Sequence, residues 1–283
     1  MSRNYIVRNM TAEEVEMVAI EWAAQEGWNP GLHDARVFYN TDPKGFYIGL
    51  LNGEPVACIS AVEYNSDFGF IGFYIVKPEH RKAGYSIKLT RAAINHLKTQ
   101  NIGLDGVVEQ QANYRKIGFK MAYNNIRLEG KTSKPANSFE EIVATTEVKF
   151  EAICAYDDQL FPAQRHQFLN EWLSLPESNA FVSIHEGDIA GYGVIRRCRQ
   201  GYKIGPLFAD SKEIARQLLL TLTGSVEPGE LFYLDIPEPN PGAIELTTEF
   251  GMSKVFETAR MYSKSFPSID LNKVFGITSF ELG

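Results

Sequence analysis

The stretch from Asp67 to Lys98 constrains the fold more than any other part of the chain, because it changes from strand to helix across one short loop. Residues 68–76 form a continuous run of apolar, aromatic and β-branched side chains with two glycines, which predicts a buried strand. From Ser86 onward apolar residues recur at helical spacing, and Ser86 is expected to open that helix. The intervening loop carries basic residues and Gly84. Backbone N–H groups and a helix dipole converge in such a loop, so the stretch predicts an anion-binding site.

Length, charge and cysteine content limit the class of protein. With 283 residues the chain is long enough for two domains of ordinary size. A formal net charge of -7 argues against broad attraction to nucleic acid or to an anionic membrane surface. Cys58, Cys154 and Cys198 are widely spaced and lack metal-ligand spacing, which predicts buried thiols in a reducing compartment and no metal site. No signal peptide or membrane-length apolar run stands out, so we expect a soluble, cytoplasmic protein.

The first half of the chain has the pattern of an α+β domain. Thr11 and Glu14 form a capping-box pattern for a helix that reaches about Gln25. A breaker-rich segment, residues 26–34, follows and predicts a loop over a site. Asn52-Gly53 between two β-like runs predicts a hairpin. The expected strands of this mostly antiparallel sheet are residues 5–8, 46–51, 56–64, 68–76, 103–108 and 121–128.

The second half repeats the order of the first. Residues 181–193 resemble 46–58 in pattern, residues 202–208 resemble 70–75, and a helix is expected at 214–223. These similarities predict two copies of one domain, not a solenoid. We predict a first domain at 1–130, a linker and connecting segment at 131–160 with its boundary at Lys131–Asn137, and a second domain at 161–283.

Three motifs occur in a fixed order in the first copy. Val-x-Pro ends the strand at Val76-Lys77-Pro78, a basic Gly-containing loop spans 81–86, and Tyr-x-Lys-x-Gly-Phe spans 114–119. This combination resembles the GNAT superfamily of acyl-CoA-dependent N-acyltransferases. The resemblance implies tandem GNAT-like domains and covers the first ~130 residues best. In the second copy residues 209–214 lack a glycine and Thr247 stands in place of Tyr114, so that copy is expected to be degenerate.

The resemblance implies acetyl-CoA as the cofactor. Its pyrophosphate would lie on backbone N–H groups of the loop, and its pantetheine arm would pair with the strand edge like an added strand. Tyr114 would be the acid that protonates the departing thiolate, and the alternative is a core tyrosine that packs on Phe119. The implied reaction is transfer of the acetyl group to a primary amine of a small molecule or peptide by direct attack. The expected coenzyme-binding residues are Phe73, Tyr74, Ile75, Val76, Arg81, Lys82, Ala83, Gly84, Tyr85 and Ser86.

The acceptor pocket is expected after the first helix, where the family contacts its acceptor. An aromatic wall with carboxylates suits an ammonium group, although Trp28 also fits a plain core position. The expected acceptor-binding residues are Trp28, Asn29, Asp34, Tyr64 and Asp105.

Three questions stay open at the level of sequence. Many family members place a glutamate on the central strand, but residues 70–74 offer no carboxylate. Glu63, Asp67 or Asp105 could act as the general base through water, or the amine could arrive deprotonated. The alternative function is a non-catalytic acyl-CoA sensor, and a further possibility is that both copies bind coenzyme. The oligomeric state is open between monomer and homodimer.

Overall fold

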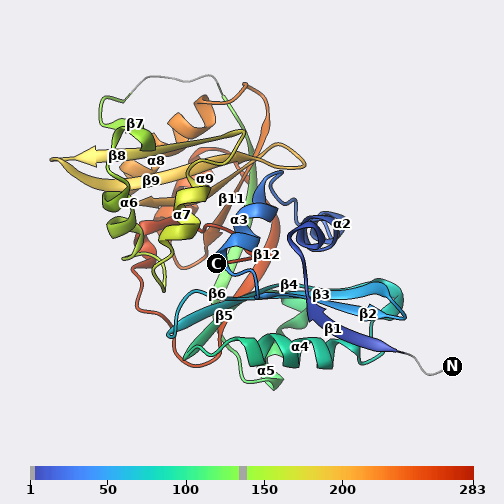
Figure 1. Ribbon diagram of the computed structural model, residues 1–283. Helices are drawn as coiled ribbons and strands as arrows, with labels where there is room; N and C mark the ends of the chain where they lie inside the picture. Colours follow the sequence, from blue (N-terminus) through green and yellow to red (C-terminus); the bar gives the residue numbers. More distant parts are fainter. Residues whose placement is uncertain (1–3, 134–138) are drawn as a thin grey trace.

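The computed structural model describes residues 4–133 and 139–283. Within them the strands join in one 13-stranded sheet of mostly antiparallel pairs, flanked by helices, which confirms the predicted α+β class (Figure 1). The strand order is β1-β2-β3-β4-β5-β12-β6-β11-β10-β9-β8-β7, with β13 beside β10. The strands of the first half are β1 Tyr5–Asn9, β2 Phe46–Leu51, β3 Glu54–Glu63, β4 Phe68–Val76, β5 Asn101–Val107 and β6 Lys120–Lys131. Those of the second are β7 Ile142–Ala144, β8 Ser178–His185, β9 Asp188–Arg197, β10 Tyr202–Ala209, β11 Leu231–Pro237, β12 Ser253–Tyr262 and β13 Val274–Gly276.

The helices cover both sheet halves and fill the space between them. Helices α1 and α2 are joined through π-helical turns at Val15–Ile20. Figure 1 shows α2, α3 and α7 between the two halves of the sheet, and α4 and α5 on the outer face of the first half. The helices are α1 Ala12–Glu14, α2 Glu21–Gln25, α3 Asp34–Thr41, α4 Tyr85–His96, α5 Gln111–Lys116, α6 Phe150–Asp157, α7 His166–Trp172, α8 Lys212–Gly224 and α9 Pro241–Glu249.

Local sequence signals position most of these elements correctly. Thr11 and Glu14 form the predicted capping box. The hairpin turn at Asn52-Gly53 has φ angles of 52° and 93°, and Glu186-Gly187 repeats both values in the second half. One expectation was wrong: α4 begins at Tyr85, and Gly84 caps it instead of Ser86. The physical reason is the left-handed conformation at Gly84, φ 83°, which glycine adopts without strain.

The two halves exchange their last strands. The sequence places 121–128 at the end of the first domain's own sheet, whereas β12 from the second half lies between β5 and β6. Strand β12 pairs with β5 from Thr258 to Tyr262, and β6 pairs with β11 along Lys131 to Asn125. Each half is therefore completed by a strand of the other. The predicted boundary Lys131–Asn137 lies partly outside the described residues, and the division 1–130, 131–160 and 161–283 stays a prediction.

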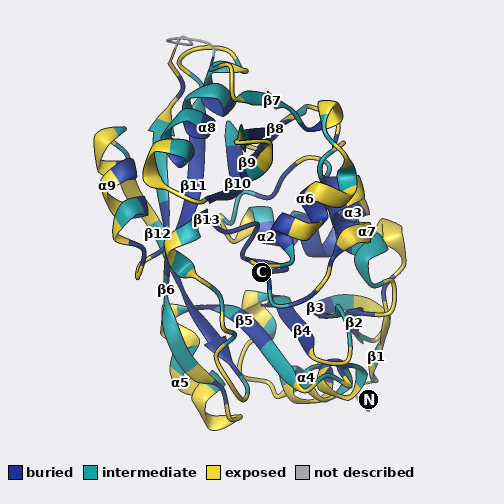
Figure 2. Cartoon of the chain, turned by 90° about the vertical axis from the view of Figure 1, so that its left-hand side faces the viewer, coloured by how far each residue is buried: buried dark blue, intermediate teal, exposed yellow. Residues whose placement is uncertain are grey.

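The largest hydrophobic core lies between the two halves. It combines side chains of α2, α3, α6 and α7 with the facing sides of β2–β4 and β8–β9, including Phe38, Phe73 and Trp172. Smaller cores lie under α4 on the first half and under α8 and α9 on the second. In Figure 2 the strands are mostly buried, and exposed residues gather on the outer helices α4, α5 and α9. The halves thus pack as one body, which lets residues of both meet at a single cavity.

Candidate active site

Strands β4 and β5 diverge at the centre of the first half. Their parallel pairing runs only from Phe68 to Ile71 on β4 and from Asn101 to Leu104 on β5, although β4 continues to Val76. At the point of divergence β4 carries a bulge, with Phe73 at φ 46°. A cavity of about 640 Å³ opens there, and residues 71–76 line it. The geometry offers a strand edge to a ligand that pairs like an added strand.

The predicted anion loop lines the same cavity. Gly84 at φ 83° and Lys82 at φ 65° turn the backbone toward it, and no side chain caps the N-terminus of α4. The first N–H groups of the helix are therefore not taken by a capping side chain, and the helix dipole favours an anion at that end. All the predicted coenzyme-binding residues except Ala83 line this cavity.

Tyr114 lies on α5 at the border between this cavity and a second, more apolar one of about 410 Å³. Its ring packs against Gly106 so closely that a Cβ there would collide with it. Burial raises the pKa of Tyr114 above the ordinary value of 10.0, and the neighbouring Tyr74 raises it further. The phenol is thus protonated at neutral pH and can donate its proton.

The expected acceptor-binding residues separate into two groups. Trp28 and Asp105 line the cavity. Asn29, Asp34 and Tyr64 are not among its lining residues and instead contact the second half. Their partners are Gln200 for Asn29 at 2.9 Å, Arg196 for Asp34 at 2.9 Å and the carbonyl of Leu282 for Tyr64 at 2.9 Å. Direct acceptor contact by these three residues stays a prediction.

Asp105 is a buried carboxylate with strong partners. Arg260 Nε and Nη2 donate to it at 2.7 and 2.6 Å, and Asn125 Nδ2 donates at 2.9 Å. Burial raises the pKa of Asp105 above the ordinary value of 3.8, and Arg260 opposes that rise. Both charged side chains are almost fully enclosed, so the pair fixes β12 against β5 as well as shaping the cavity wall.

Sequence reasoning missed the contribution of the second half to the cavity. Phe256 and Thr258 of β12, and Phe280 and Glu281 beyond β13, line it. No local signal marks them, because they reach the cavity through strand exchange and through a segment that crosses from one half to the other. Only the long-range pairing of β12 with β5 makes this visible.

The second half contains no equivalent open slot in the described residues. Strands β10 and β11 pair from Tyr202 to Ile204 and then diverge as β4 and β5 do, but β13 pairs with β10 beyond that point. The chain itself thus fills the edge that would receive a ligand. Ser211 also caps α8 by accepting from Ile214 N at 3.3 Å. Thr247, in the place of Tyr114, bonds the carbonyl of Ala243 in its own helix at 3.0 Å.

The divergent strands, the predicted anion loop and the half-buried Tyr114 fit the arrangement of an acyl-CoA-dependent acyltransferase. Residues 15–119 match the acetyltransferase (GNAT) family, and residues 153–276 match an acetyltransferase (GNAT) domain. The holothin acyltransferase of Pseudoalteromonas sp. is 34% identical over 264 residues, covering 93% of this chain and 90% of that protein. The chain therefore belongs to the GNAT family, with two GNAT domains, and is an acyltransferase.

Solved structures share the tandem fold at low sequence identity. A putative acetyltransferase from Pyrococcus horikoshii has a TM-score of 0.84 and 22% identity, covering 99% of this chain and 96% of the other. A tandem GNAT protein from the clavulanic acid biosynthesis pathway has a TM-score of 0.65 and 13% identity, covering 94% and 100%. Among the described residues, no helix has the length and apolar character needed to cross a membrane.

Proposed function

We propose that this protein transfers the acetyl group of acetyl-CoA to a primary amine of a small molecule or peptide, by direct attack of the amine on the thioester. The observation that supports this most strongly is that one cavity is lined by the free edge of β4, the anion loop and Tyr114. These are the groups that thioester binding, pyrophosphate binding and thiolate protonation require.

The coenzyme is proposed to enter along the loop and end at the bulge of β4. Its pyrophosphate accepts hydrogen bonds from backbone N–H groups between Arg81 and Ser86, where the left-handed Gly84 lets the backbone approach. Its pantetheine arm pairs with residues 73–76. The second half does not compete, because β13 fills its equivalent edge. One coenzyme per chain is therefore expected.

The chemistry needs no covalent intermediate with the protein. The lone pair of a neutral amine forms the C–N bond at the carbonyl carbon, and collapse of the tetrahedral intermediate breaks the C–S bond. Tyr114 gives its proton to the departing sulfur, and the surplus proton on nitrogen restores the phenol. Because Tyr114 has a raised pKa, it carries that proton throughout the neutral range.

The acceptor is proposed to enter between the Trp28 loop and β12. The Trp28 ring offers an aromatic wall to an ammonium group, and Asp105, paired with Arg260, lines the same cavity. Asn29, Asp34 and Tyr64 support this region by fixing the loop and β3 to the second half. The similar protein from Pseudoalteromonas sp. is named for acyl transfer to holothin, which supports an acceptor other than water for this chain.

Two measurements on the full chain test this function. Titration calorimetry with acetyl-CoA should give a stoichiometry near one, whereas no binding at millimolar coenzyme would end the proposal. Thiol release from acetyl-CoA, followed with a panel of amines, amino sugars and peptides, should rise above hydrolysis for at least one acceptor. Binding without turnover on any acceptor would instead support a sensor.

A further inference from the structure

Glu281 is a buried carboxylate without a partner in the described structure. The residue is 2% exposed and lines the cavity, and neither carboxylate oxygen has a hydrogen-bond partner among the described residues. An ionised carboxylate is expensive to bury unless something compensates it. A buried acceptor of this kind beside a reaction cavity therefore points to a ligand or a catalytic role.

The position of Glu281 matches the reacting end of the proposed coenzyme site. A Cβ added to Gly72 of β4 would collide with the carbonyl oxygen of Glu281, so the two backbones are in direct contact. Gly72 immediately precedes Phe73, the bulged residue where β4 and β5 have separated. The central strand carries no carboxylate of its own at this point. Glu281, a glutamate from the second half, therefore lies next to the part of β4 where many GNAT proteins carry a glutamate and this chain carries none.

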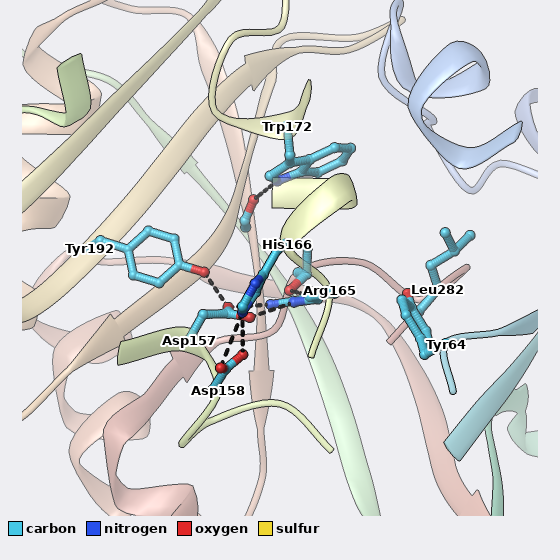
Figure 3. A network of polar contacts seen from close by, with 10 residues as sticks. Tyr64, Asp157, Asp158, Arg165, His166, Trp172, Tyr192 and Leu282 are labelled. Atoms are coloured by element: carbon cyan, nitrogen blue, oxygen red, sulfur yellow. Dashed lines mark hydrogen bonds and ion pairs between the residues drawn. The ribbon is translucent and has the colours of Figure 1, made fainter. Parts of the chain in front are cut away.

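A network of buried contacts holds this glutamate in place. Glu281 belongs to the 277–283 segment, which follows β13. Figure 3 shows Arg165 beside Asp157. Arg165 Nη1 also donates to Thr278 Oγ1 at 2.8 Å. Tyr64 of the first half donates to the carbonyl of Leu282 at 2.9 Å. The segment is anchored at both ends, so the side chain between them has a defined position.

The other carboxylates that line the cavity are already engaged. Glu26 bonds Arg81 at 2.5 Å, and Asp105 is paired with Arg260. Glu63 and Asp67, which the sequence offers as alternatives, do not line the cavity. They accept hydrogen bonds from Lys98 N and Gln100 Nε2, in the segment between α4 and β5. Among the carboxylates that line the cavity in the described part of the chain, Glu281 is the one without a hydrogen-bond partner.

Cations behind the cavity wall compensate the charge of Glu281. Arg127 on β6, Arg196 on β9 and Lys203 on β10 are buried. Burial and the nearby Arg127 lower the pKa of Lys203 below its ordinary value, and the negative charge of Glu281 opposes that shift. Glu281 also favours the charged forms of Arg127 and Arg196. Asp235 neutralises Arg127 and Asp34 neutralises Arg196, through ion pairs at 2.7 and 2.9 Å. Lys203 is left without a carboxylate within ion-pair distance in the described residues, and its Nζ reaches only the carbonyl of Trp28 at 3.4 Å. Among these cations Lys203 is therefore the one whose charge Glu281 is left to offset, and the charges of the two side chains attract each other.

We infer that Glu281 is the general base of the first-domain active site, supplied by the second GNAT domain. This inference rests on the proposed N-acetyl transfer. The carboxylate takes one proton from the acceptor ammonium, which leaves a neutral amine with a free lone pair, and later releases that proton to solvent. The amine then forms the C–N bond at the thioester carbonyl, and collapse of the tetrahedral intermediate breaks the C–S bond while Tyr114 protonates the sulfur. The second domain thus has a chemical role although its own coenzyme slot is filled.

The decisive variant is Glu281→Gln, which keeps the shape of the side chain but cannot accept the proton. With an acceptor found for the wild type, kcat/KM at pH 7 should fall at least about 10²-fold, as expected for loss of a general base. Affinity for acetyl-CoA should stay within twofold. Because only pre-deprotonated amine would react, the rate of the variant should rise tenfold per pH unit until the acceptor amine itself has titrated. Glu257→Gln, which changes a carboxylate of β12 paired with Lys254 outside the cavity, is the matched control and should behave as wild type.

Two outcomes would overturn the inference without touching the proposed function. One is an active wild type whose Glu281→Gln variant keeps its rate within threefold. The other is a slow variant whose pH–rate profile is parallel to that of the wild type, since that pattern indicates a structural role. If Glu281→Gln does not fold, Glu281→Asp keeps the negative charge and shortens the side chain by one methylene. It should fold and lose at least tenfold in kcat, and an unchanged kcat would contradict the inference. An inactive wild type would count against the proposed function instead.

Discussion

The ion pair between Asp105 and Arg260 allows a sharp stability prediction, because it fixes the exchanged strand β12 to β5. The side chains are 0% and 5% exposed, and two bonds of 2.7 and 2.6 Å join them. Arg260→Leu would leave a buried carboxylate whose remaining partner is Asn125. Breaking a buried pair in this way costs about 3–5 kcal/mol of unfolding free energy at neutral pH.

The pH dependence of this loss has a definite sign. Burial already raises the pKa of Asp105 above 3.8, and Arg260 is the largest influence that opposes the rise. Removing Arg260 therefore raises the folded-state pKa further above the unfolded value. A folded state with the higher carboxyl pKa binds more protons between those two values, so its stability rises as pH falls through them. The loss of unfolding free energy caused by Arg260→Leu should therefore be smaller at pH 5 than at pH 7.

Urea unfolding of the wild type and the variants at pH 7 and pH 5 measures these losses of unfolding free energy. Replacing both partners, Asp105→Asn with Arg260→Leu, should cost less than Arg260→Leu alone, since no charge is then left unpaired. Lys254→Leu breaks an exposed pair with Glu257 and should cost less than about 1 kcal/mol. A loss below about 1 kcal/mol for Arg260→Leu, or the same loss at pH 7 and pH 5, would refute the reasoning.

Three further predictions concern the active site and the buried thiols. Tyr114→Phe should lower kcat about 10²-fold or more and leave acetyl-CoA affinity within twofold, and a variant with wild-type kcat would contradict the acid role; because the pKa of Tyr114 is raised above 10, the wild-type kcat should show no falling limb from Tyr114 below pH 10, and such a limb that disappears in the variant would contradict the raised pKa. Gly72→Ala places a Cβ 2.9 Å from the backbone carbon of Glu281, so unfolding free energy should fall by about 1–3 kcal/mol and turnover should fall with it, and wild-type kcat would argue against the contact. Cys58, Cys154 and Cys198 are buried with raised pKa values, so a thiol reagent should label them only on unfolding, and rapid labelling of the native protein would show that the packing is wrong.

Most elements of the fold can be predicted from sequence patterns that span only a few residues. The strand at 68–76 was predicted with the bounds of β4, and the capping box at Thr11 and the Asn52-Gly53 turn formed as expected. Each of these depends on residues only a few positions apart, where local sterics and hydrogen bonds decide the conformation. The repeat of the second half was also visible, because the Glu186-Gly187 turn copies the first one.

Long-range pairing could not be predicted in the same way. Nothing in residues 253–262 indicates that they pair with β5 instead of their own half, since a strand pattern does not specify its neighbour. The acceptor residues show the consequence: Asp34 reads as a pocket carboxylate in the sequence but is paired with Arg196 from the second half. Glu281 has no signal at all, because its importance arises only from its contact with Gly72.

A structure of the protein with bound acetyl-CoA tests the central claim most directly. The account predicts one coenzyme per chain, with its pyrophosphate on the backbone of residues 81–86 and its sulfur within hydrogen-bond reach of the Tyr114 hydroxyl. The carboxylate of Glu281 should lie on the opposite side of the thioester, within reach of an incoming amine directly or through one water. Coenzyme bound at β10 of the second half, or a thioester remote from both Tyr114 and Glu281, would contradict it.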